Sequence, residues 1–289
     1  MTAPVLAVDG PSLLYRAFYA LPDSIKDGSG QPVNALLGTT NLVLQEIERH
    51  EPRAVVLCFG AEAAAYRVEL HSGYHADRPE VPDDLAPQFA ASRDFFEAFG
   101  WTVSEDDSLE ADDLLGSYAE IEQRAGGSAL LLTGDRDMFQ VASEQVSVLY
   151  VSTGVKGAQE VGPVEVRDRY GIDPAQVPDF IALRGDPSDG IPGAKGVGEK
   201  TAAELLREHG TLETILDQAI RIPKPKLRTT LIESAEQLLA FKRMATLQDA
   251  RVERPPDRYT DWAGAAVAAG ALGMNRLAER LQRIGSGTE

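Results

Sequence analysis

Cysteine is nearly absent from this sequence: Cys58 is the single one among 289 residues, which excludes a disulfide framework and any zinc site built from several cysteines. No apolar stretch reaches the roughly 18 residues that a membrane span needs, and the N-terminus lacks the basic segment and apolar run of a signal peptide. The Gly-x-Ser-x-Gly motif of serine hydrolases and the nucleotide-binding P-loop are also missing. We therefore expect a soluble, cytoplasmic protein that does not use a nucleophilic serine or cysteine, with Cys58 buried in the core.

Positive charge is scarce, because 28 lysines and arginines face 45 aspartates and glutamates and the formal net charge is −17. An acidic surface repels the phosphates of nucleic acids, so a nucleic-acid partner would need basic side chains gathered in one place. Eight of the acids fall in motifs that resemble metal-ion sites, and the four positive charges of two divalent ions would change the balance from −17 to −13. The remainder is still acidic, and binding to a polyanion should weaken steeply as salt rises.

Short apolar runs alternate with helical patterns in the first half of the chain, which is typical of parallel β-α-β units. The strand candidates are Val5–Val8, Ala54–Phe59, Ala129–Thr133 and Val146–Val151, and the helical patterns cover Pro11–Tyr19, Ala35–Arg49, Leu85–Phe99 and Glu110–Arg124. The apolar runs hardly alternate with polar residues, as in strands that are covered on both faces. We predict an α/β core over residues 1–172, with a mostly parallel central sheet flanked by helices.

The second half shows helical patterns and no strand signal. Helices are predicted near residues 176–184, 198–209, 211–220, 228–243 and 264–284, which together make a helical subdomain over 173–289. Residues 71–87 break the pattern with glycines and prolines, and so long a connection is usually functional or disordered. Residues 221–228 are basic and contain prolines, which fits a solvated linker or a phosphate contact.

Four acidic motifs stand where a parallel sheet places its ligands, at the carboxyl ends of strands or the starts of helices. They comprise Asp9 after the first strand candidate, Glu110, Asp112 and Asp113 in the first turn of a helix, Asp135 and Asp137 after the third strand candidate, and Asp186 and Asp189 in a loop fixed by proline and glycine. Each motif alone has an ordinary explanation as a helix cap, a helix-dipole interaction or a turn. Three adjacent acids repel one another, so a bound cation explains them better.

The ligand chemistry of these motifs indicates the reaction. Carboxylate oxygens favour Mg²⁺ or Mn²⁺ over zinc, and the four histidines show no zinc-ligand spacing. Two such ions about 3.5–4 Å apart can activate a water and stabilise a departing oxygen, which is the chemistry of phosphodiester hydrolysis. The segment Gly193–Ala202 follows the last acidic motif with closely spaced glycines, Lys195 and Lys200, and it can hold a phosphate without reading bases.

These residues resemble the 5′ nuclease domain of bacterial DNA polymerase I and the flap endonucleases, along nearly the whole chain. The likeness is carried by Glu110-Ala111-Asp112-Asp113, Gly134-Asp135-Arg136-Asp137 and Gly185–Ala202, the last of which is similar to that family's helix-three-turn-helix and places it at about 185–207. The resemblance implies that all eight acids hold two or more Mg²⁺ or Mn²⁺ ions. It also implies a K⁺ ion at the helix-three-turn-helix.

The same resemblance implies which residues approach the substrate. Residues of about 71–100 should form a helical arch that admits a 5′ single strand, with Arg78, His75 and Lys195 as the catalytic cations. The expected DNA contacts are Tyr15, Arg16, Tyr19, Arg67, Tyr74, Gly196, Val197, Gly198, Lys200 and Thr201.

Two positions depart from the family pattern. Gly60 stands where the family has an aspartate, so one carboxylate of the metal cluster is missing, and His75 stands where the family has a lysine. We therefore expect weaker metal retention and a pH-dependent activity, because histidine changes its charge near neutral pH and lysine does not.

The function that follows is that of a stand-alone, monomeric 5′ exonuclease or flap endonuclease. Its expected partners are DNA with a 5′ flap, a 5′ overhang or a nick, together with a DNA polymerase and a ligase in primer removal and repair, and no membrane. Two alternatives stay open. A PIN-type ribonuclease has a similar acidic α/β site but lacks the glycine-lysine segment at 193–202, and a DNA-structure-binding homologue could have lost catalysis through Gly60.

Overall fold

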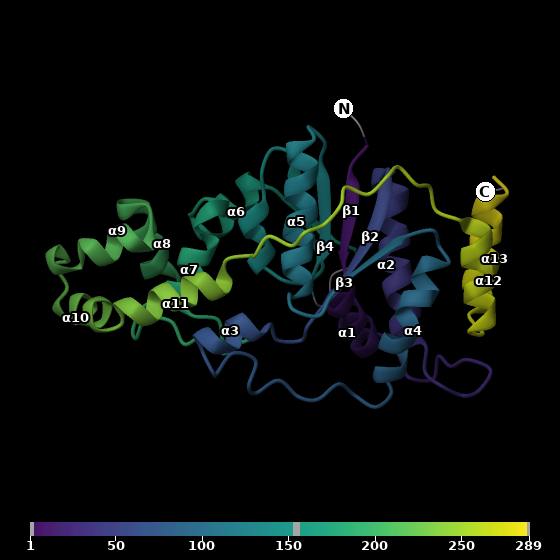
Figure 1. The fold of residues 1–289 in the computed structure, drawn as a ribbon, viewed down its shortest axis with the longest axis horizontal. Helices are drawn as coiled ribbons and strands as arrows, with labels where there is room; N and C mark the ends of the chain where they lie inside the picture. Colours follow the sequence, from purple (N-terminus) through teal and green to yellow (C-terminus); the bar gives the residue numbers. More distant parts are fainter. Residues whose placement is uncertain (1–2, 153–156, 288–289) are drawn as a thin grey trace.

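A six-stranded sheet forms the centre of the computed structural model, which describes residues 3–152 and 157–287 (Figure 1). The strand order is β3-β2-β1-β4-β5-β6, from β1 Val5–Asp9, β2 Ala54–Gly60, β3 Thr102–Asp106, β4 Ala129–Thr133, β5 Val146–Tyr150 and β6 Gln159–Val161. The first five strands are parallel, and β6 is antiparallel to β5. The predicted α/β fold with a mostly parallel sheet is confirmed.

Helices cover both faces of the sheet because successive strand residues point to opposite sides. On one face Ala7, Val56 and Leu131 pack with α5 (Ala111–Arg124), and Cys58 is buried there as expected. On the other face Val8 packs in a second cluster with α1, α2 and α4. These helices are α1 Gly10–Ala20, α2 Asn34–His50 and α4 Ala86–Glu97. No helix within the described ranges is long and apolar enough to cross a membrane.

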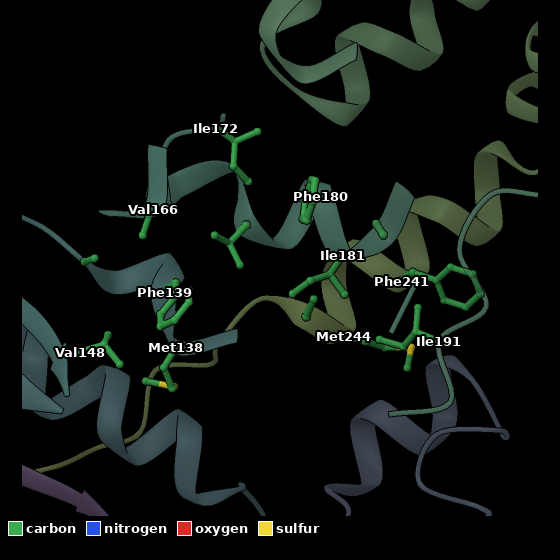
Figure 2. Close-up of a cluster of buried hydrophobic side chains, with 14 of the residues drawn as sticks. Met138, Phe139, Val148, Val166, Ile172, Phe180, Ile181, Ile191, Phe241 and Met244 are labelled. Carbon is green, nitrogen blue, oxygen red and sulfur yellow. The ribbon is translucent and has the colours of Figure 1, made fainter. Parts of the chain in front are cut away.

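The helical subdomain continues one of these two cores rather than building its own. Its elements are α7 Val177–Arg184, α8 Glu199–His209, α9 Leu212–Asp217, α10 Pro225–Glu233 and α11 Ala235–Ala245, with short 3₁₀ turns η2 Pro174–Gln176 and η3 Ala219–Arg221. The 3₁₀ turn η1 Asp137–Val141 and the helix α6 Pro163–Tyr170 precede it in the α/β core. Figure 2 shows Phe139 and Val148 in one cluster with Phe180 of α7 and Phe241 of α11. The apolar contact is therefore continuous from the sheet to the helices.

An extended strap, residues 248–261, leads from α11 back along the molecule to a terminal helical hairpin (yellow-green to yellow in Figure 1). Arg53 ties the strap down, because its Nη1 donates to the Pro255 carbonyl at 2.7 Å and to Asp257 at 2.8 Å. The hairpin consists of α12 Trp262–Ala271 and α13 Asn275–Gly285. It packs into the α2 and α4 side of the sheet.

Several elements differ from the sequence-based predictions. The polar edge strand β3 and the three-residue strand β6 were not predicted, and neither were α3 (Ala65–Leu70) and α6. The helices predicted at 228–243 and 264–284 are each two helices, broken at Ser234 and at the left-handed Gly273. As their glycines and prolines predicted, residues 71–85 at the entry to the expected arch form turns and irregular backbone rather than a regular helix.

Candidate active site

Acidic side chains from five segments line one cleft of about 730 Å³ at the carboxyl ends of the central strands. Because β1 lies between β2 and β4, the loops that follow these strands meet at the point where the strand order reverses. Seven of the eight predicted metal ligands line this cleft: Asp9, Glu110, Asp112, Asp135, Asp137, Asp186 and Asp189. Asp113 does not, and Glu62, which the motifs did not suggest, does.

Asp9 combines a structural role with a place in the cleft. As the last residue of β1 it caps α1, since the Ser12 N–H donates to its Oδ1 at 3.0 Å. The Thr133 hydroxyl, at the end of β4, donates to its Oδ2 at 2.6 Å. The helix-cap explanation is thus correct without excluding metal binding, because Asp9 still lines the cleft.

The negatively charged carboxylates at the centre of the cleft repel one another. Burial, followed by the charges of Asp135 and Asp9, raises the pKa of Asp112 well above its ordinary value. Burial also raises the pKa of Asp135 to about 6, with Asp189 adding to the shift. The pKa of Asp137 is raised well above normal by burial and by Asp135. A cation in the cleft would relieve this repulsion.

Asp135→Asn should therefore stabilise the metal-free protein at neutral pH. A carboxyl group whose pKa is higher in the folded than in the unfolded protein destabilises the fold as pH rises from the unfolded value to the folded one, here from 3.8 to about 6. Since one pKa unit corresponds to about 1.4 kcal/mol, we expect the variant to gain about 3 kcal/mol over the parent across this window. Urea unfolding in EDTA at both ends of the window measures it.

A matched control is Asp94→Asn, an exposed acid on α4, which should leave the free energy of unfolding unchanged at both pH values. Added Mn²⁺ should stabilise the parent more than Asp135→Asn, because a ligand that binds only the folded state stabilises it. Equal unfolding free energies for parent and Asp135→Asn at both ends of the window would contradict the repulsion described above.

Glu110 and Asp113 form a buried ion-pair network with Arg67. Asp113 Oδ1 accepts from Arg67 Nη2 and from the Gln248 N–H, both at 2.8 Å, and its Oδ2 accepts from the Glu110 N–H at 3.1 Å. Arg67 Nη1 lies 3.0 Å from Glu110 Oε2 without hydrogen-bond geometry. Arg67 is 3% exposed, so the structure places it in the interior rather than at the DNA contact expected from the sequence.

Tyr74 and His75 connect this network to the arch entry. The Tyr74 hydroxyl donates to Glu110 Oε2 at 2.8 Å, and Tyr74 is buried at the cleft wall. Its ring stacks on His75, with the centroids 3.8 Å apart. His75 has a left-handed backbone with a φ of 53°, which brings Nδ1 to 2.8 Å from the Glu62 carbonyl and Nε2 to 3.1 Å from Asp189.

The loop after α7 carries the last two acids, and each is paired with a cation. Asp189 accepts from Arg78 at 3.1 Å as well as from His75; burial alone would raise its pKa, but these two partners lower it below its ordinary value. Asp186 accepts from Arg184 Nη2 at 3.2 Å. Arg184 lines the cleft, and no motif had pointed to it. The expected catalytic residues Arg78 and His75 thus lie at the cleft, held by Asp189.

Gly60, the position of the missing carboxylate, is a point of close backbone approach. A Cβ atom there would lie 2.4 Å from the Leu109 carbonyl oxygen and 2.6 Å from the Ala111 nitrogen. The Ala61 N–H donates to the same carbonyl at 2.8 Å. The glycine lets the start of α5, with its acids, lie directly against the end of β2.

The remaining expected DNA contacts fall into three groups. Tyr15 and Arg16 line the cleft, and Arg16 Nη2 donates to the Gly134 carbonyl at 2.7 Å. Tyr19 is exposed but does not line it. Lys195 and the residues around the start of α8 lie outside the cleft: Val197 is buried, whereas Lys195, Gly196, Gly198 and Lys200 are exposed and Thr201 is half-buried.

The side chains of the cleft fit hard divalent cations. The acidic residues supply carboxylate oxygens, which are the ligands that such ions prefer. The pKa values of Asp112, Asp135 and Asp137 are raised by burial and by neighbouring negative charge, which a bound cation would balance. In residues 3–152 and 157–287, no three Asp, Glu, His or Cys side chains are arranged to hold a metal ion by themselves. Mg²⁺ is commonly held by one or two carboxylates together with waters and substrate phosphates, so such an open arrangement suits it.

Family models match almost the whole chain. The model described as the 5′-3′ exonuclease N-terminal resolvase-like domain matches residues 4–171, and the one described as the 5′-3′ exonuclease C-terminal SAM fold matches residues 172–261. The chain belongs to the 5′-3′ exonuclease family. A 5′-3′ exonuclease of Mycobacterium tuberculosis is 34% identical to it, with 98% of both chains covered. Members of this family are phosphodiester hydrolases, and this chain is a nuclease of that kind.

Relatives that are DNA polymerases are much longer than this chain. DNA polymerase I of Mycobacterium bovis is 39% identical over 74% of this chain, and that of Bacillus caldotenax is 35% identical over 88%. This chain spans about a quarter of the length of these polymerases, 24% of the first and 29% of the second.

Solved structures of other proteins share the fold. A T5 flap endonuclease in complex with DNA and metal ions has a TM-score of 0.70 at 19% identity, covering 98% of this chain and 99% of that one. The catalytic core of Rad2 in complex with DNA substrate has a TM-score of 0.63 at 16% identity, covering 98% and 91%. The sheet and the helical subdomain therefore form one shared architecture.

Proposed function

We propose that this nuclease hydrolyses DNA phosphodiesters near 5′ ends, as a divalent-metal-dependent 5′ exonuclease and flap endonuclease. The observation that carries the proposal is the convergence of eight carboxylates in one cleft, seven of them from the acidic motifs, with His75 and Arg78 at its wall. Substrates would be 5′ flaps, 5′ overhangs and nicks, met during primer removal and repair. We further propose that the protein acts as a cytoplasmic monomer alongside a DNA polymerase and a ligase.

Each part of the cleft has a proposed role. Asp9, Glu110, Asp112, Asp135, Asp137, Asp186 and Asp189 would hold two or more Mg²⁺ or Mn²⁺ ions, directly or through water. When bound, such ions activate a water and stabilise the departing oxygen. Arg78 would contact the phosphate that is cut, while His75 orients the Asp189 carboxylate.

Duplex binding would fall to the glycine-rich turn before α8. Gly196 has a φ of 81°, and nothing lies within 4 Å of the Cβ positions of Gly196 and Gly198. A DNA phosphate, or a K⁺ ion through the carbonyls, would therefore meet no steric obstacle beside these two glycines, while the Val197 N–H between them donates to the Ala194 carbonyl at 3.0 Å. The exposed Lys195 and Lys200 add positive charge beside it, so Lys195 would serve binding rather than the chemical step.

The decisive test is cleavage of a 5′-labelled flap duplex with Mg²⁺ or Mn²⁺, comparing the parent with Asp135→Asn. Loss of a cleft carboxylate should lower the rate at least about 100-fold, the upper end of what losing a residue that supports a metal costs. The control Asp94→Asn should cut like the parent. The product should lie near the flap junction.

Other results would favour the alternatives. Binding of the flap without cutting at any metal concentration would mean an impaired, structure-binding homologue. Cutting of an RNA strand with no cutting of DNA would favour a PIN-type ribonuclease. Equal cutting by the parent and Asp135→Asn would refute the carboxylate mechanism.

A further inference from the structure

Two exposed arginines next to the cleft are held by aromatic rings. Arg136 stands between two cleft acids in the sequence, yet its Nε donates to the Tyr150 hydroxyl at 3.0 Å and its guanidinium lies 5.6 Å from that ring's centroid. Arg169, on α6, lies over the same ring at 5.7 Å and over Phe139 at 5.5 Å. Arg136 and Tyr150 both line the cleft.

Neither arginine is neutralised by a carboxylate. Within the part of the chain that the structure describes, no acidic group lies within ion-pair distance of Arg136 or Arg169, and the one side-chain partner of Arg169 besides the rings is the neutral Gln159 at 3.1 Å. Arg78 and Arg184, which also line the cleft, are each paired with an aspartate. Arg136 and Arg169 therefore keep their positive charge available to an outside anion.

The aromatic support orders these guanidinium groups in advance. Tyr150 and Phe139 are buried and pack edge to face, with their centroids 5.5 Å apart. Tyr170 extends the cluster by packing against Phe139. A guanidinium held by such ring contacts loses less side-chain freedom when it binds a phosphate than an unsupported one does, and its five N–H groups exceed those that these contacts use.

We propose that Arg136 and Arg169, supported by Tyr150, form a phosphate-binding edge for the DNA strand in the cleft, one or more phosphates away from the bond that is cut. The proposal rests on the nuclease function above, because it assigns a DNA contact to the same cleft. The need for it is electrostatic: a cleft lined by carboxylates repels the backbone, and an unpaired pair of arginines beside it offsets that repulsion.

The test is fluorescence anisotropy of a labelled 5′-flap duplex in EDTA, over a series of KCl concentrations, for the parent and the double variant Arg136→Gln/Arg169→Gln. We expect the Kd to rise about tenfold, as for the loss of charge-assisted hydrogen bonds of about 1.4 kcal/mol in total. The slope of log K against log salt should become shallower by about 0.7–0.9 for each DNA phosphate that the variant no longer neutralises.

The matched control is Arg167→Gln, an exposed arginine on the same helix that is paired with Asp173. It removes the same charge from α6 and should leave both the Kd and the slope close to the parent values. Tyr150→Phe keeps the ring but removes the acceptor of Arg136, so it should raise the Kd a few-fold while leaving the slope unchanged. Thermal unfolding of each variant separates a defect in binding from a defect in folding.

A double variant that binds and responds to salt like Arg167→Gln would overturn the phosphate-binding edge. Cleavage by the parent in Mg²⁺ is scored separately. If the parent cuts and the double variant binds normally, the edge is wrong and the nuclease function stands. If the parent does not cut but its DNA binding depends on Arg136 and Arg169, the edge stands and the nuclease function is wrong.

Discussion

Gly60→Ala should lower the free energy of unfolding by about 3 kcal/mol, the upper end of the usual cost of overpacking. The added Cβ would lie 2.4–2.6 Å from backbone atoms of residues 109–111, which cannot rotate away as a flexible side chain could. Relief requires α5 to move from β2, and α5 is preceded by its N-cap Glu110 and carries Asp112 in its first turn, both of which line the cleft. Gly60→Asp adds a charge to the same strain and should unfold more readily still.

Urea unfolding of Gly60→Ala against Gly28→Ala checks this expectation. Gly28 has no atom within 4 Å of its Cβ position, so its substitution should change stability by no more than about 0.5 kcal/mol. The family pattern alone suggests the opposite for Gly60→Asp, a gain of metal binding through a restored ligand. If Gly60→Asp folded like the parent and bound Mn²⁺ more tightly, the start of α5 would be able to move away from β2 and make room for the side chain.

Arg67→Met should destabilise the protein by about 3–5 kcal/mol, the range for removing one partner of a buried ion pair. Arg67 and Asp113 are almost completely buried, and the methionine would leave Asp113 and Glu110 charged without a cation beside them. Arg67 also donates through Nε to the Met244 carbonyl at 3.0 Å, so the end of α11 would lose its tie to this network. Chemical denaturation measures the loss.

Two comparisons separate this structural role from a DNA contact. Arg93→Met removes an exposed arginine with two acidic partners, Glu97 and Glu105, and should cost no more than about 1 kcal/mol. Adding Asp113→Asn to Arg67→Met should cost less than the two single changes together, because the stranded charge is then gone. If Arg67→Met kept the stability of the parent but bound DNA more weakly, Arg67 would be a DNA contact, as expected from the sequence.

The sequence was sufficient to place those site residues that directly follow a buried strand. The runs before Asp9 and Asp135 are apolar on both faces, so their ends could be placed, and parallel strands bring such ends to one edge of the sheet. The acids at 186 and 189 were expected there as the fourth acidic motif, in a loop fixed by proline and glycine, and they line the same cleft. The metal roles of these residues stay predictions.

Other features depend on contacts between distant residues, which periodicity does not show. Strand β3 is half-exposed at the sheet edge and reads Thr-Val-Ser-Glu-Asp, too polar for the pattern of a buried strand. The environment of Arg67 depends on Met244, 177 residues away, and that of Arg136 on a ring at the end of another strand. The carboxylate missing at Gly60 could be noticed in the sequence, whereas the backbone contact that excludes a side chain there could not.

The return of the chain through the strap bears on how the protein folds. The terminal hairpin lies beyond residue 261, yet Ala265 and Leu281 belong to the same cluster as Phe96 near the sheet. Arg53 and Arg254 both pair with Glu122, which fastens the strap to α5 on the way. The last helices thus complete a core begun by the first hundred residues. The two halves are interleaved in space, and neither can reach its full apolar contact until synthesis has reached the C-terminal end.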